Sequence, residues 1–91
     1  MYLKDIVKVT CREDYKEHFK TEYFHTRERY EKLKDLNNKI EAYEQLRHEK
    51  RILMEEPKHD CPLTLLKQQQ KVMGEYLHLL EVRAIIEKIE L

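Results

Sequence analysis

The sequence lacks several residue types that particular functions require. Its 91 residues include no serine, no tryptophan, one glycine and two prolines. Without serine there is no serine nucleophile, and a single glycine excludes the glycine-rich loops that cradle phosphates. The longest uninterrupted apolar runs have three residues, far fewer than a membrane span needs. These absences argue against a serine hydrolase, a phosphate-loop protein and a transmembrane protein.

Cysteine is also scarce. Cys11 and Cys61 do not make a disulfide framework, and no signal-peptide pattern precedes them. We therefore expect reduced thiols and a cytoplasmic location. His59 and Cys61 are close in sequence, yet no C-x-x-C or H-E-x-x-H motif completes a metal site. Neither an enzyme activity, a metal nor a cofactor is expected.

Charge does not point to any one class of partner. The 18 basic and 18 acidic side chains cancel, so there is no overall attraction to nucleic acid or to an anionic membrane. Charged residues make up 40% of the chain and helix breakers are few, which is typical of long helices. A chain this short forms one small domain and buries only about 60–65% of its unfolded surface. The fold class expected is all-α.

The first long helix is predicted from about residue 11 to residue 54. Thr10 and Glu13 match a capping box, and no proline follows until Pro57. Seven residues at alternating four- and three-residue spacing form a heptad-like seam along this helix. They are Phe19, Tyr23, Thr26, Tyr30, Leu33, Asn37 and Ile40.

The second long helix is predicted from about residue 62 to residue 89, after a turn at about 55–61. Pro62 suits its first position. Two apolar columns together cover about half of its circumference, more than one partner helix can bury. Gly74 lies within the helix and predicts the close approach of a neighbouring backbone. The columns are Leu66, Met73, Leu77, Leu80, Ala84 and Leu91, and Leu65, Val72, Tyr76, Leu79 and Ile86.

The lengths of the two helices do not match. At 1.5 Å per residue they measure roughly 65 Å and 45 Å. Either the N-terminal part of the first helix overhangs, or that helix breaks near Asn37 and Asn38. Both geometries favour a homo-oligomer, a dimer first, with a three-helix monomer as the alternative. Residues 1–10 are expected to form an arm or a short helix before the hairpin of residues 11–91.

Two clusters are candidate sites. Tyr23, Arg27 and Tyr30 have the spacing at which aromatic rings and a guanidinium can stack on a base and hold a phosphate.

The second cluster is a polar column within the apolar arc of the second helix: Gln69, Tyr76 and Arg83. One interpretation is an interface whose polar groups fix the register, with Arg83 paired to Glu87. The other is a pocket for a small anionic molecule.

The chain resembles a family of short helical proteins encoded by phages and prophages of Gram-positive bacteria, with relatives in other tailed phages, including crAss-like phages. The resemblance begins at Tyr15 and rests on two patterns, R-Y-x-K-L and L-L-x-x-Q-x-x-x-M-x-x-Y-x-x-x-L-x-x-R. The matching residues are Arg29, Tyr30, Lys32 and Leu33, then Leu65, Leu66, Gln69, Met73, Tyr76, Leu80 and Arg83.

This resemblance implies a phage accessory protein that acts by stoichiometric binding in the cytoplasm of a bacterial host. Host modulation or counter-defence is the expected role, through sequestering a nucleotide signal or blocking a host defence protein. A protein inhibitor would carry an exposed aromatic patch near Phe19, Tyr23 and Phe24. The alternative is a structural or assembly protein of the phage.

Overall fold

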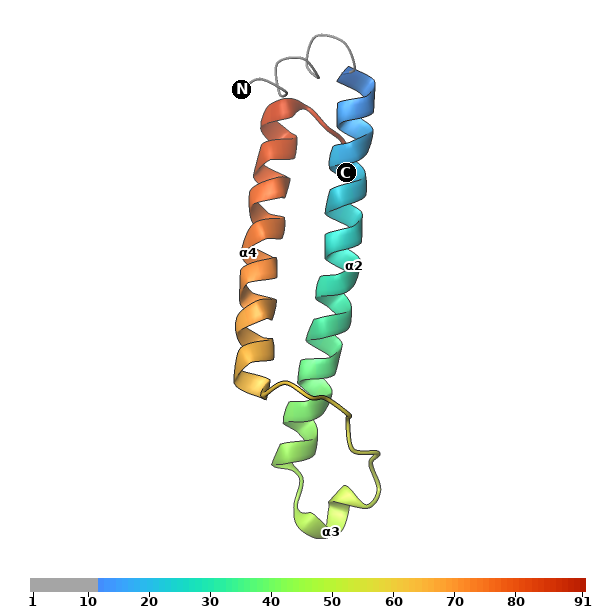
Figure 1. Ribbon diagram of the computed structural model, residues 1–91, viewed down its shortest axis with the longest axis vertical. Coiled ribbons are helices and arrows are strands. Elements are labelled where there is room, and N and C mark those ends of the chain that lie inside the picture. The colour runs from blue at the N-terminus through green and yellow to red at the C-terminus, as the bar shows by residue number, and fades with distance from the viewer. Residues whose placement is uncertain (1–11) are drawn as a thin grey trace.

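The computed structural model describes residues 12–91 of the chain. Within them three helices follow one another and no strand occurs. Helix α2 spans Arg12–Gln45, the short helix α3 spans His48–Arg51, and helix α4 spans Leu63–Glu87. Figure 1 shows α2 and α4 side by side, which confirms the expected all-α hairpin. The expectations for residues 1–10, including the capping threonine, lie outside the described residues.

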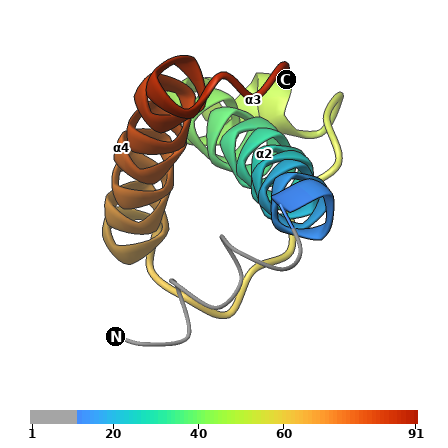
Figure 2. The ribbon, with the colours of Figure 1, turned by 90° about the horizontal axis from the view of Figure 1, so that it is seen from above.

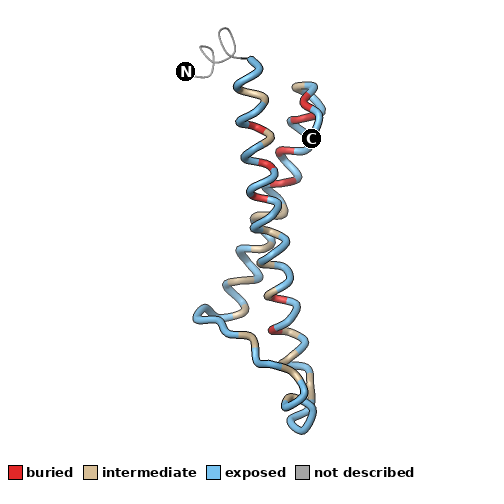
Figure 3. Tube along the Cα trace, turned by 90° about the vertical axis from the view of Figure 1, so that its right-hand side faces the viewer, coloured by how far each residue is buried: buried red, intermediate tan, exposed pale blue. Residues whose placement is uncertain are grey.

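The seam predicted for α2 is the face that packs against α4. Acidic side chains in the first turn, Glu13 and Asp14, favour the helix start because they oppose the positive end of its dipole. Figure 3 shows the buried positions along this face of α2. Tyr30 and Leu33 are half-buried, so every residue of the predicted seam faces inward. The five that are fully buried are Phe19, Tyr23, Thr26, Asn37 and Ile40.

Asn37 fixes the level at which α4 meets α2. Its buried Nδ2 donates to the carbonyl oxygen of Leu66 at 3.1 Å and to Oε1 of Gln70 at 2.9 Å. A different alignment of the helices would leave this Nδ2 without partners, which is costly for a buried polar group. Asn37 therefore specifies the register, as a polar residue in a helical seam does. Helix α2 continues through Asn37 and Asn38, so the break considered there does not occur.

The predicted end of the first helix, near residue 54, is wrong. Helix α2 ends at Gln45, and α3 begins only at His48. The Arg51 side chain explains the stop, because its Nε donates to the carbonyl oxygens of Tyr43 and Leu46, both at 3.1 Å. Carbonyls that a further turn of helix would have bonded are thus satisfied by a guanidinium instead.

The overhang lies at the opposite end from the one expected. The N-terminal part of α2 is covered by α4, as the hydrogen bond between Tyr15 and Glu87 shows. It is the C-terminal part of α2, with α3, that extends beyond α4 (Figure 1). The reason is the connection after α2, which returns along the hairpin before α4 starts at Leu63.

Helix α4 buries one of its two apolar columns. Leu77, Leu80 and Ala84 of the first column are buried against α2. The second column is exposed along its whole length. Viewed from above, α4 has one neighbouring long helix, α2, among the described elements (Figure 2). Among residues 12–91, α4 is therefore covered on one of the two sides that the sequence predicts.

Among residues 12–91, no helix combines the length and the apolar character that crossing a membrane would require.

Candidate functional site

A cavity of about 480 Å³ opens between α2 and α4 near the middle of the hairpin. We call it the central pocket. Two of its lining residues, Tyr23 and Leu77, are buried, whereas its charged lining residues are exposed. The accessible lining is therefore mostly polar. The pocket is lined by Tyr23, Arg27, Tyr30, Glu31, Gly74, Leu77, His78 and Glu81.

Helix α2 brings the first candidate cluster into this pocket. Tyr23, Arg27 and Tyr30 all line it, because spacings of four and three residues place them on one face of a helix. The half-buried Tyr30 offers a ring surface for stacking and the exposed guanidinium of Arg27 offers paired donors to a phosphate, whereas the Tyr23 ring is buried.

Helix α4 contributes the opposite wall, and Gly74 sets how closely Tyr30 approaches it. A Cβ atom at Gly74 would lie 3.2 Å from Cε1 of Tyr30, tighter than an ordinary contact. The glycine predicted to admit a neighbouring backbone thus admits an aromatic ring instead.

One hydrogen bond joins two residues that line the pocket. The Tyr23 hydroxyl donates to Oε2 of Glu81 at 2.5 Å, which joins α2 to α4. This bond, together with burial, raises the pKa of the Tyr23 hydroxyl above its ordinary value. Tyr23 is therefore a neutral, fixed surface rather than a base. Arg27, Glu31 and Glu81 give the pocket both signs of charge, and His78 adds an imidazole.

The second candidate cluster lies on the other flank of the hairpin. Tyr76 and Gly74 are two residues apart, which turns them about 200° from each other around α4. The Tyr76 hydroxyl donates to Glu22 at 2.9 Å, and Gln69 contacts the Met73 sulfur at 3.9 Å. The structure therefore separates these polar groups from the central pocket.

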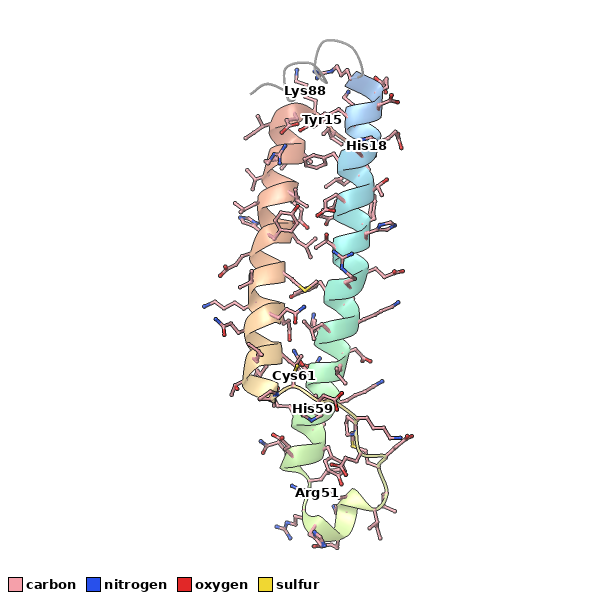
Figure 4. All side chains as sticks on the ribbon, in the orientation of Figure 1. Tyr15, His18, Arg51, His59, Cys61 and Lys88 are labelled. Atoms are coloured by element: carbon pink, nitrogen blue, oxygen red, sulfur yellow. The ribbon has the colours of Figure 1, made fainter. Side chains whose placement is uncertain are left out.

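Arg83 belongs to a clamp at the end of the hairpin. Its Nε donates to Glu87 at 3.0 Å and its terminal nitrogen donates to the Tyr15 hydroxyl at 2.7 Å. The guanidinium also lies 5.0 Å from the centre of the Phe19 ring. Burial alone would lower the pKa of Arg83, but Glu87 and Tyr15 outweigh it and raise that pKa. Figure 4 shows Tyr15 between the ends of the two long helices.

The histidines and the described cysteine do not assemble. His59 Nδ1 lies 2.7 Å from the backbone oxygen of Cys61, not from its sulfur. His18 lies at the other end of the hairpin from both (Figure 4). Among residues 12–91, no three His, Cys, Asp or Glu side chains come together as metal ligands would.

Three lining residues were not singled out from the sequence: Glu31, His78 and Glu81. Glu31 follows Arg27 by four residues, so its place on the same side of α2 could have been read from helical spacing. His78 and Glu81 could not be assigned, because which residues of α4 face Tyr23 depends on the register between the helices.

These features define a small all-α hairpin protein with an open, polar-rimmed pocket between its long helices. The chain belongs to the Sequestin family, whose family model matches residues 13–86. The match covers α2 and α4 except for one terminal residue of each. Neither the curated proteins nor the solved structures that were compared include a match to the chain.

Proposed function

We propose that this protein sequesters a small nucleotide signal in the central pocket, without catalysis. The observation that carries the proposal is that Tyr23, Arg27 and Tyr30 line one cavity between the helices. The family name, Sequestin, supports a role in stoichiometric binding. Together with the resemblance of the sequence to phage proteins, the family name supports counter-defence in the cytoplasm of a bacterial host as the proposed role. The proposed assembly is a homo-oligomer, with a dimer as the first expectation.

The size and chemistry of the pocket suit a nucleotide. A cavity of about 480 Å³ falls within the usual range for small-molecule sites, about 300–1,000 Å³. An aromatic ring contributes about 1–3 kcal/mol when a base stacks on it. Arg27 would hold a phosphate, and the carboxylates of Glu31 and Glu81 would accept hydrogen bonds from sugar hydroxyls.

The charges that line the pocket limit the number of phosphate groups that the ligand can carry. The two carboxylates of the pocket oppose a dense anion, because one guanidinium cannot neutralise several phosphates. A nucleotide with one or two phosphate charges fits better than a triphosphate.

The competing mechanism is inhibition of a host protein through an exposed aromatic patch. The structure does not expose two of the three residues expected to form that patch. Phe19 and Tyr23 are buried, and of the three residues expected there only Phe24 is exposed, by 44%. The expectation of an exposed patch near these residues is therefore wrong. Phe19 and Tyr23 are buried because α4 covers this part of α2.

The test is calorimetric titration with a nucleotide panel that includes cyclic dinucleotides. We expect saturable binding by the natural sequence and a loss of affinity of about 10–100-fold in Arg27→Ala and in Tyr30→Ala. Arg29→Ala is the matched control, since Arg29 is an exposed arginine of the same helix outside the pocket lining. If no nucleotide binds, or if Arg29→Ala weakens binding as much as Arg27→Ala, the proposal fails.

A further inference from the structure

We propose that a second copy of the chain packs antiparallel against the exposed apolar column of α4, around a two-fold axis. This outer column consists of Leu65, Val72, Leu79 and Ile86. The inference deepens the homo-oligomer part of the proposed function, because it names the surface and the geometry of the assembly.

The outer column is too apolar and too regular to be ordinary surface. Its four side chains are between 54% and 72% exposed, and each follows the last by seven residues. Exposed Tyr76 and Val82 adjoin it. Residues seven apart lie almost above one another on a helix, so the column is a continuous apolar stripe. Such a stripe marks an interface, since monomers seldom expose one of this extent.

The surface area of the chain leaves room for such an interface. The accessible surface is 7535 Å², whereas a compact monomer of 11.3 kDa exposes about 5,700 Å². The excess of about 1,800 Å² exceeds the roughly 800 Å² that each partner contributes to a standard interface. The small core agrees with this: among residues 12–91, the core cluster of buried hydrophobic side chains has six members. Association would complete the burial that the hairpin alone does not reach.

A second copy fits the stripe better than an unrelated surface does. A seven-residue apolar repeat along a straight helix packs against another helix with the same repeat. Helix α4 has 25 residues, so its own counterpart matches it in length as well as in spacing. The net charge of the chain is zero, so no overall repulsion opposes self-association.

The charge of Arg83 and the helix dipoles favour an antiparallel over a parallel pair of α4 helices. In a parallel pair, Arg83 of each copy would lie beside Arg83 of the partner subunit, and the helix dipoles would align. In an antiparallel pair centred between Val72 and Leu79, the two Arg83 residues are about 22 Å apart along the axis. The dipoles then oppose each other favourably. This arrangement places Leu65 opposite Ile86 of the partner subunit and Val72 opposite Leu79 of the partner subunit.

The assembly leaves the central pocket open. Leu79 and Gly74 are about 140° apart around α4, so the stripe and the pocket occupy different faces. Gln69, Tyr76 and Arg83 border the stripe, which assigns this column to the edge of the dimer interface. Dimerisation and ligand binding are therefore separable by mutation.

Light scattering and analytical ultracentrifugation over a dilution series test the surface. We expect the natural sequence to be a dimer and Leu79→Glu to weaken the dimer at least about 100-fold, because two copies of the charge enter one interface. Leu53→Glu is the matched control, since Leu53 is exposed but lies outside α4. A monomeric natural protein, or a Leu79→Glu variant as dimeric as the control, would overturn the proposal.

Cross-linking tests the direction, in a background where Cys11 and Cys61 are replaced by alanine. Leu65→Cys and Ile86→Cys should form a disulfide dimer when the two single variants are mixed, and neither should do so alone. A disulfide dimer of Leu65→Cys by itself would show a parallel pair and overturn the arrangement. Titration of Leu79→Glu with the same nucleotide panel separates the two proposals. If no nucleotide binds the natural protein while it remains a dimer, the sequestering function fails and the interface stands.

Discussion

Lys88 shows how a single backbone conformation finishes the hairpin. It has φ 59° and ψ 45°, the left-handed region, and its N–H bonds back to the carbonyls of Ala84 and Ile85. The N–H of Ile89 reaches the carbonyl of Ala84 at 2.8 Å. This turn folds Ile89 onto the core cluster, where it is buried. The conformation costs a non-glycine residue about 1–2 kcal/mol.

Lys88→Gly should therefore raise the free energy of unfolding by about 0.5–1 kcal/mol in urea denaturation, since glycine adopts this region without steric cost. Lys71→Gly is the control, an exposed position inside α4 where glycine should cost about 1 kcal/mol. Equal effects at the two positions would contradict the role of the left-handed turn.

At the scale of the element, the end of α2 depends on a side chain from the following helix. Arg51 donates from Nε to two carbonyls and from a terminal nitrogen to the Glu44 carbonyl at 3.0 Å. Its guanidinium also lies 5.2 Å from the centre of the Tyr43 ring. Cations near a helix C-terminus are favourable because they oppose the negative end of the dipole. Arg51 thus stabilises the last turn of α2 and holds α3 against it.

We expect Arg51→Ala to lower the free energy of unfolding by about 1 kcal/mol and to speed amide hydrogen exchange in the last turn of α2. The comparison is Arg47→Ala, which removes an exposed arginine of the same connection. Unchanged exchange rates in the last turn after Arg51→Ala would show that the cap does not hold the helix end.

At the scale of the whole molecule, one kind of hydrogen bond recurs between the two long helices. In each case a tyrosine hydroxyl donates to a glutamate carboxylate of the other helix, and the pKa of that tyrosine is raised above 10.0. Burial is the first cause for one tyrosine, and the bond to the glutamate is the first cause for the other two. The bonds are Tyr15–Glu87 at 2.6 Å, Tyr23–Glu81 at 2.5 Å and Tyr76–Glu22 at 2.9 Å.

These bonds predict a loss of stability in alkali. Because the folded pKa values are raised, the folded chain keeps protons that the unfolded chain releases near pH 10. The stabilisation by these hydrogen bonds is complete below that pH and is lost as the pH rises through the pKa values of the tyrosines in the folded chain. Thermal denaturation from neutral pH to about pH 11, followed by circular dichroism, should show the decline.

The variant Tyr15→Phe, Tyr23→Phe, Tyr76→Phe is the control for this alkaline decline, since its lysines titrate as before. It should lose distinctly less stability between neutral and alkaline pH than the natural sequence. An equal decline in both proteins would assign the effect to the lysines.

The sequence by itself determined which faces of the helices are apolar. Phe19, Tyr23 and Ile40 point inward because spacing along one helix is a local property. The same spacing placed Arg27 and Tyr30 beside Tyr23, and it marked the outer column of α4 as a second apolar face. These residues required no knowledge of what lies opposite them.

Only the tertiary structure decided how the helices align. The path of the chain after Gln45 and the bond of Asn37 to Leu66 set the register. That register placed the overhang at the α3 end and brought Glu81 opposite Tyr23. Such contacts join residues far apart in the sequence, and no helical period encodes them. The pocket therefore combines one wall that the sequence determined with another that the fold supplied.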